Sequence, residues 1–220
     1  RSFLSGRVSW GLSNSMLIVS GAFGVFQKQA VIEVGGYKTN TIGEDMEIVV
    51  RLHSYMRKHK RKYKIIFCED AVCWTQGPMS LKDIRGQRRR WQIGLLDTLI
   101  SHKNLLFNPK YGTVGLVAVP YFWIFELSGA LIEVLGYFII PFSLIMGELN
   151  IFFFVIYFLL ATLLGIMLSI GSLILEQYTK KNAMTAKQYI LISVYAILEN
   201  FGYRQLITLF RVEGILKYRK

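Results

Sequence analysis

The stretch LNIFFFVIYFLLATLLGIMLSIGSLIL, residues 149–175, contains no charged residue over 27 positions. Eighteen of these residues are Leu, Ile, Phe or Val. Insertion scales assign about 0.3 to 0.6 kcal/mol to each such residue, or roughly 5 to 11 kcal/mol in favour of insertion for the whole stretch. We therefore predict a membrane-spanning helix here. This helix needs no function beyond anchoring.

A second apolar stretch, residues 113–147, lies just before it. A single straight helix of that length would extend roughly 50 Å at 1.5 Å per residue. The hydrocarbon core of a bilayer is only about 30 Å thick. Pro120 and Pro141 are potential kink sites, so we expect an interfacial start followed by a span near residues 122–146.

Glu126 and Glu133 are the charged residues of this second stretch, and their separation of seven places them on one helix face. A carboxylate in a span costs on the order of 3 kcal/mol, so this face should look into a helix bundle or a wet channel. The sequence leaves three alternatives for a third apolar stretch, residues 189–210. It crosses the membrane and places its basic end, residues 211–220, on the side that the positive-inside rule disfavours, or it lies at the membrane interface, or the chain continues beyond residue 220.

The charge is concentrated in the first half of the chain. Residues 1–112 carry a net charge of +10 out of the total of +12. Such a surface suits nucleic acid, anionic lipid or a phosphorylated substrate. The apolar second half favours the last two, and the basic run at residues 57–62 lacks any groove-reading pattern, so nucleic acid is not an expected partner. The apolar stretches predict a multi-pass protein of the cell membrane. Residues 176–187 contain lysines whereas the turn at Gly147-Glu148 has no basic residue, so the positive-inside rule places residues 1–112 and 176–187 in the cytoplasm.

The first half mixes helix and strand signals. A short helix at residues 28–34 should end at Gly35-Gly36, and an amphipathic helix should begin at Glu44 or Asp45. Residues 63–67 and 71–75 have the composition of two short strands. Apolar residues along the amphipathic helix indicate a buried stripe: Ile48, Val49, Leu52 and Met56.

A third helix is expected over residues 80–106, with Ser80 as its N-cap and Asp83 three residues later. Gln87, Arg90 and Trp91 lie three and four residues apart and therefore share one face of this helix. A guanidinium can bind a diphosphate through paired hydrogen bonds, and an indole offers a flat surface on which a sugar can stack. The apolar positions of this helix suit either a bilayer surface or a soluble core.

Two other features have plain structural explanations as well as functional ones. Asp45 at a helix start can simply stabilise the helix N-terminus. The small residues of Ser20-Gly21-Ala22-Phe23-Gly24 allow a close backbone approach, but a strand and turn explain them too. Cys68 and Cys73 match no zinc pattern and are expected to be reduced thiols.

Taken in order, these short motifs resemble one family. Ser20 to Gly24, then Gly35-Gly36-Tyr37, then Gly43-Glu44-Asp45, then Gln87-x-x-Arg90-Trp91, followed by membrane spans, is similar to the membrane-embedded family 2 glycosyltransferases. That family includes cellulose, hyaluronan, chitin and poly-N-acetylglucosamine synthases. The resemblance covers the chain as a C-terminal portion of such an enzyme.

The resemblance implies a role for each matching residue. Asp45 would be the catalytic general base, and Glu44, Gln87, Arg90 and Trp91 would bind substrate. Ser20 and Gly21 would lie close to the acceptor. The implied reaction is inverting transfer of a sugar from a nucleotide sugar, expected to be a UDP-sugar, to a growing polysaccharide. The alternatives are a non-processive enzyme that forms a glycolipid and a non-catalytic membrane-anchored subunit.

The resemblance also implies an α/β fold, the C-terminal half of a GT-A domain followed by a transmembrane helical region. The expected domains are residues 1–79 for the GT-A part, 80–112 for an interfacial helix and 113–220 for the membrane region. The family uses Mg²⁺ or Mn²⁺ with an Asp-x-Asp motif, which this sequence does not contain. The main metal ligands are therefore expected upstream, with none assigned here. Gly43 stands where the family often has Thr.

Overall fold

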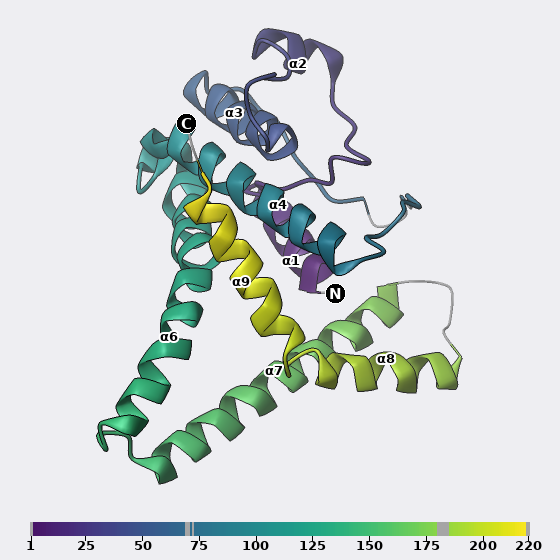
Figure 1. Ribbon diagram of the computed structural model, residues 1–220. Coiled ribbons are helices and arrows are strands. Elements are labelled where there is room, and N and C mark those ends of the chain that lie inside the picture. Colours follow the sequence, from purple (N-terminus) through teal and green to yellow (C-terminus); the bar gives the residue numbers. More distant parts are fainter. Residues whose placement is uncertain (1, 69–70, 72, 180–184, 219–220) are drawn as a thin grey trace. The chain divides into compact units, whose positions relative to one another are not determined.

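The computed structural model describes residues 2–68, 71, 73–179 and 185–218 (Figure 1). The chain forms two compact units. The motif unit comprises residues 9–131 and 210–220, and the apolar unit comprises residues 1–8 and 132–209. Helices α1 (Ser2–Leu12), α6 (Ser128–Ile145) and α9 (Tyr203–Leu216) each begin in one unit and end in the other.

The predicted α/β fold is wrong. Over the described residues the regular elements are all helical, and no strand forms at 63–67 or at the described positions of 71–75 (Figure 1). Val72 lies outside the described residues. A strand is stabilised by its pairing with a neighbour rather than by its own composition.

An asparagine side chain takes the place of a neighbouring strand beside residues 63–67. Asn14 Nδ2 donates to the carbonyl of Tyr63 at 3.0 Å, and Asn14 Oδ1 accepts from the N–H of Ile65 at 2.9 Å. This side chain satisfies two backbone groups that a sheet ladder would otherwise use. The segment is therefore extended and anchored without belonging to a sheet.

The first two predicted helices of this unit are confirmed. Helix α2 covers Lys28–Glu33 and is followed by Gly35 and Gly36, both with positive φ, at +87° and +74°. Helix α3 covers Glu44–Lys58 with Gly43 as its N-cap. Its predicted apolar stripe is buried and forms a small core with residues of α2 and its surroundings: Ile48, Val49, Leu52 and Met56.

Helix α4 covers Leu81–Ser101 and begins with the predicted capping box between Ser80 and Asp83. It ends five residues earlier than predicted and is followed by the short turns η1 (Lys103–Leu105) and η2 (Pro109–Tyr111). Its apolar side is part of the larger core, which also includes residues of α3 and of the helical turns after α4. The buried members from α4 are Leu95, Leu96 and Leu99.

The first long apolar helix runs without interruption from Val114 to Ile145 and is 32 residues long. It consists of the π-turns η3 (Val114–Ala118) and η4 (Phe122–Leu127) around the single turn α5 (Val119–Tyr121), followed by α6. Proline removes a backbone donor, and a wide turn accommodates that loss. Pro120 lies between the two π-turns, and Pro141 lies inside α6.

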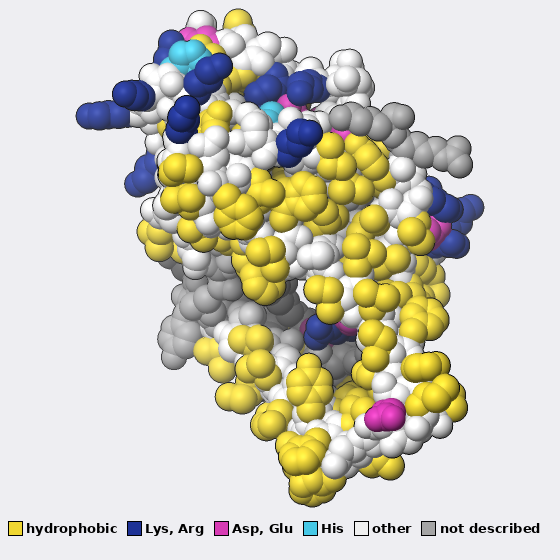
Figure 2. Space-filling model, turned by 90° about the vertical axis from the view of Figure 1, so that its left-hand side faces the viewer, with side chains coloured by type: hydrophobic (Ala, Val, Ile, Leu, Met, Phe, Trp, Pro, Cys, Tyr) yellow, Lys and Arg dark blue, Asp and Glu magenta, His cyan; other side chains and the backbone are white. Residues whose placement is uncertain are grey.

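Helix α7 (Ile151–Thr179) is the second long apolar helix. Both helices are long and apolar enough to cross a membrane, and only 6% and 0% of their most apolar windows are buried within the protein. Figure 2 shows extensive hydrophobic surface on the part of the chain that includes these helices. The third apolar stretch divides into α8 (Ala186–Leu198) and α9 rather than forming one helix.

Candidate functional site

Asp45 lies in the first turn of α3 and is half-buried. Its Oδ1 accepts a hydrogen bond from the N–H of Met46 at 2.8 Å. The N-cap position itself is occupied by Gly43, which has no side chain to cap the helix. The acidic first turn, which also includes Glu44 and Glu47, therefore interacts favourably with the positive end of the helix dipole. Glu44 is exposed.

Asp45 also contacts the small-residue segment. A Cβ added to Gly21 would lie 3.0 Å from Asp45 Oδ2, so the carboxylate packs directly over this glycine. Ser20, half-buried, accepts from the N–H of Phe23 at 3.1 Å through its carbonyl and so closes a turn. Two of the predicted motif segments therefore meet in the structure at Gly21 and Asp45.

A contact between two glycines connects the start of α3 with α4. A Cβ on Gly94 would lie 2.8 Å from the Cα of Gly43, and a Cβ on Gly43 would lie 2.8 Å from the Cα of Gly94. Only glycine allows two backbones to approach this closely without a shift. Gly94 is four residues after Arg90 and three after Trp91, so it continues the face that carries the Gln-x-x-Arg-Trp motif.

The motif face of α4 is open. Arg90 is exposed, Gln87 is half-buried, and the Trp91 side chain is 55% exposed. The guanidinium of Arg88 lies 4.7 Å from the centre of the Trp91 ring, a cation–π contact that favours one ring orientation. An exposed indole held in this way is suited to stacking against a flat ligand.

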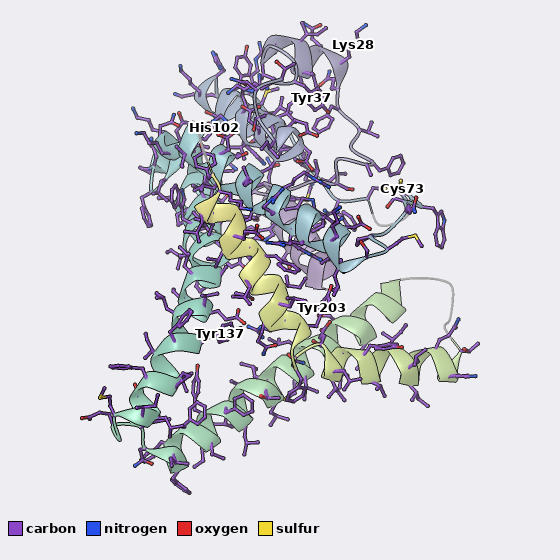
Figure 3. All side chains as sticks on the ribbon, viewed as in Figure 1. Lys28, Tyr37, Cys73, His102, Tyr137 and Tyr203 are labelled. Atoms are coloured by element: carbon purple, nitrogen blue, oxygen red, sulfur yellow. The ribbon has the colours of Figure 1, made fainter. Side chains whose placement is uncertain are left out.

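A buried ionic network holds the opposite side of α3. Glu47 is 1% exposed and accepts from Lys38 at 2.9 Å, from Arg51 at 2.9 Å and from His102 at 3.1 Å. Burial alone would raise the pKa of Glu47, but the hydrogen bonds from His102, Lys38 and Arg51 outweigh it and lower the pKa to about 2. Glu47 is therefore ionised, and it joins α3 to His102 at the C-terminal end of α4. Figure 3 labels His102.

This network fixes the direction of Asp45. Two residues on a helix differ by about 200°, so Asp45 lies on the side of α3 opposite Glu47. The Glu47 side faces His102, and the Asp45 side faces Gly21. The carboxylate of Asp45 is therefore directed away from the network.

A further hydrogen-bond chain holds the loop before α3. Thr41 Oγ1 donates to Asp97 Oδ2 at 2.7 Å, and the Tyr218 hydroxyl donates to Asp97 Oδ1 at 2.9 Å. These residues line a cavity of about 330 Å³ together with Lys38 and Glu47. The cavity connects the loop, α4 and the C-terminal residues of the motif unit into one polar region.

These supporting residues were not predictable from the sequence. Glu47 and Asp97 had no distinctive signal in the sequence, because their partners His102, Thr41 and Tyr218 lie on other segments of the chain. Gly94 carried a usable signal, because an isolated glycine inside a helix costs about 1 kcal/mol relative to alanine and usually has a packing reason.

The described residues contain no group of three or more His, Cys, Asp or Glu side chains placed to hold a metal ion. Cys68 and Cys73 are both free and exposed. The residues present in the described part of the chain therefore do not fit the divalent metal that the resemblance implies. No step of the reaction proposed below depends on a metal held by this chain.

The chain has an acidic helix start packed on a small-residue turn, and a glycine contact joins this start to a helix with an exposed Gln/Arg/Trp face. The family profile described as "Glycosyl transferase family group 2" matches residues 3–172. The chain therefore belongs to the family 2 glycosyltransferases.

Two similar curated proteins are poly-beta-1,6-N-acetyl-D-glucosamine synthases. The chain is 34% identical over 89 residues to the poly-beta-1,6-N-acetyl-D-glucosamine synthase of Staphylococcus aureus (strain COL), covering 40% of this chain and 20% of that protein. It is 30% identical over 92 residues to the synthase of the same name from Staphylococcus epidermidis, covering 42% and 21%. The matched region is thus about a fifth of the length of these relatives. No solved structure matches the chain significantly.

Proposed function

We propose that this chain is the acceptor-side portion of a membrane-embedded, inverting glycosyltransferase that extends a polysaccharide. The donor is a nucleotide sugar of the UDP class, and the reaction takes place at the cytoplasmic face of the membrane. The family membership and the two synthases named above support the polysaccharide product. The contact of Gly43 with Gly94 is the single observation that carries the assignment of the site, because it brings the two motif-bearing helices together.

In this proposal Asp45 is the general base. Its carboxylate accepts the proton of the acceptor hydroxyl while the hydroxyl oxygen forms a bond to the anomeric carbon. The bond from that carbon to the diphosphate breaks at the same time, and the nucleoside diphosphate leaves with the electron pair. A single displacement of this kind inverts the configuration at the anomeric carbon.

The motif face of α4 is proposed to contact both the leaving diphosphate and the acceptor sugar. Arg90 is exposed and forms no ion pair with the described residues. Its guanidinium is proposed to stabilise the charge that develops on the leaving diphosphate. Trp91, held by Arg88, stacks on the acceptor sugar. Gln87 and Glu44 are proposed to hydrogen-bond substrate, and Ser20 and Gly21 to border the acceptor beside Asp45.

The proposal is tested with the full-length gene product in membranes. These are incubated with a panel of labelled nucleotide sugars, and the products are sized. We expect a long polymer from the wild type and no transfer by Asp45→Asn, whose amide cannot accept the proton. Glu148→Gln, an exposed acid in the turn between α6 and α7, is the matched control and should retain activity.

Each other outcome has a defined meaning. A glycolipid as the product would replace the polymer assignment with a non-processive transferase. Absence of transfer with every donor would favour a non-catalytic subunit. Undiminished transfer by Asp45→Asn would show that Asp45 is not the base.

A further inference from the structure

The last apolar stretch is interrupted at residues 199–202, between α8 and α9. Side chains satisfy the backbone groups that the interruption frees. Gln205 accepts from the N–H of Gly202 at 2.7 Å and donates to the carbonyl of Asn200 at 3.0 Å, and Asn200 donates to the carbonyl of Ala196 at 3.0 Å. Within hydrocarbon no water can serve these groups, so an internally satisfied break is what a membrane interior requires.

The break lies beside residues 165–169 of α7. A Cβ on Gly165, the fifteenth of the 29 residues of α7, would lie 3.2 Å from Asn200 Oδ1. One turn further on, the Ser169 hydroxyl donates to Glu199 at 3.3 Å. Of the two candidate spans among the described residues, the one in α7 has the higher mean hydropathy and is the better candidate for a complete span. The apolar span Ile151–Ser172 ends seven residues after Gly165 and three residues after Ser169, so the break lies inside that span, roughly 5 to 10 Å from its end.

Two ion pairs show how α9 runs relative to the long apolar helix that ends as α6. Arg211 lies 3.5 Å from Glu126, and Arg204 lies 3.4 Å from Glu133. The second pair is seven residues later on the long helix and seven residues earlier on α9, so the two helices are antiparallel. These pairs also explain why the apolar helix contains two glutamates, because each glutamate forms an ion pair with an arginine of α9.

The same register gives the depth of the break. Residues 199–202, just before Arg204, are level with about residues 135–138 of α6. That position is seven to ten residues, or roughly 10 to 15 Å, before the end of α6 at Ile145. Both neighbouring helices thus place the break inside the apolar layer (Figure 3, where Tyr137 on α6 and Tyr203 at the start of α9 are labelled).

The other end of α9 lies against α4. Glu213 accepts from Arg85 at 2.7 and 3.0 Å, and Arg211 donates to Gln92 at 3.0 Å. Gly214 packs so closely that a Cβ there would lie 2.9 Å from the carbonyl oxygen of Arg89. The C-terminal half of α9 is therefore fixed to the helix that carries the Gln-x-x-Arg-Trp motif.

We propose that α8 and α9 form a re-entrant hairpin. It enters the membrane from the face that carries residues 1–112, turns at residues 199–202 inside the bilayer, and returns to the same face. Helix α8, with 13 residues, is about 20 Å long and too short to cross about 30 Å of hydrocarbon.

This arrangement also resolves the charge conflict of a third full span. The basic residues of 211–220 and the lysines of 176–187 are then on the same side as the basic first half, as the positive-inside rule requires. The inference rests on the proposed membrane location and is independent of the proposed reaction. It concerns the path of the chain, so it can be tested without any activity.

The test uses single cysteines in the full-length protein after Cys68 and Cys73 are replaced by serine. Leu216→Cys reports the end of α9, Phe201→Cys the break, and Met146→Cys the turn between α6 and α7; all three side chains are exposed on the protein surface. A membrane-impermeant maleimide is applied to intact cells, to inverted vesicles and to detergent-solubilised protein. The wild-type pair Cys68 and Cys73 reports the side of residues 1–112.

The hairpin predicts three different patterns. Leu216→Cys reacts in inverted vesicles but not in intact cells, like the wild-type pair. Phe201→Cys reacts only in detergent, and Met146→Cys reacts in intact cells.

Reaction of Leu216→Cys from outside would establish a complete third span and overturn the proposal. Reaction of Phe201→Cys in inverted vesicles would establish an interfacial segment and overturn it equally. Tyr203→Cys replaces Phe201→Cys if that variant does not accumulate. Failure of Met146→Cys to react in intact cells would instead overturn the proposed membrane topology.

Discussion

Replacing Gly94 with alanine would place a methyl carbon 2.8 Å from the Cα of Gly43. Ordinary van der Waals contact begins at 3.4 Å, so the two backbones must separate by about 0.6 Å. Alanine is favoured over glycine in a helix interior by up to about 1 kcal/mol, whereas overpacking costs about 1 to 3 kcal/mol. Because Gly43 is the N-cap of α3, the shift moves Asp45 relative to the motif face of α4.

The matched control is Gly86→Ala in the same helix. A Cβ there has Arg90 Nη1, the end of a flexible side chain, as its nearest neighbour at 3.7 Å. Gly86→Ala should therefore gain helix stability, and Gly94→Ala should be about 1 to 3 kcal/mol less stable than this control. A misplacement of 1 Å can cost about 100-fold in rate, so we expect Gly94→Ala to lose about tenfold or more in sugar transfer.

The assay compares both variants with the wild type for initial rates of sugar transfer in membranes and for thermal unfolding in detergent. Equal rates and equal unfolding temperatures for Gly94→Ala and Gly86→Ala would refute the reasoning. That result would mean that the close approach of α3 to α4 does not position the candidate site.

Two further predictions concern pH and the docking of α9. Burial lowers the pKa of His53, which is fully buried between the Met16 carbonyl and the Tyr63 hydroxyl, to about 4, so the folded state keeps it neutral. The free energy of unfolding has its full value with respect to His53 above pH 6.5, the ordinary pKa of histidine. It falls by up to about 3 kcal/mol as the pH falls from 6.5 toward 4, because the unfolded chain binds the proton first. Protonation of Glu47 lowers the free energy of unfolding by a similar amount between pH 4.5 and 2. Unfolding temperatures measured across this range should fall in both windows, and a His53→Gln variant whose curve is as steep as the wild type's between pH 6.5 and 4 would contradict the first. Glu213→Arg should expose the end of α9 to protease, and adding Arg85→Glu should restore part of the protection; no restoration would argue against this ion pair as the link between α9 and α4.

The helices that position the site were predictable because their signals are local. The capping box at Ser80 and the glycines after α2 act within one turn, and the buried stripe of α3 follows from its period. The two strands were not predictable in the same way. Their composition was suitable, but pairing depends on a distant partner, and residues 63–67 are hydrogen-bonded to Asn14 instead.

The break between α8 and α9 shows the same limit in the apolar half. Hydropathy continues through residues 189–210, so composition alone cannot locate a turn that other helices stabilise. Glu199, Asn200 and Gly202 were the local signal, because a polar run followed by glycine interrupts an apolar helix. The partners of Arg204 and Arg211 on the long apolar helix became visible only when the helices were assembled.

The central claim is that Asp45 and Arg90 act on one sugar-transfer event although they lie on separate helices. A double-mutant cycle with Asp45→Asn and Arg90→Lys tests it, with Arg89→Lys as the matched control for α4. If both residues stabilise one transition state, the double variant will lose far less transfer activity than the product of the two single losses. A double loss equal to that product would show that the two residues act independently, and would contradict the account.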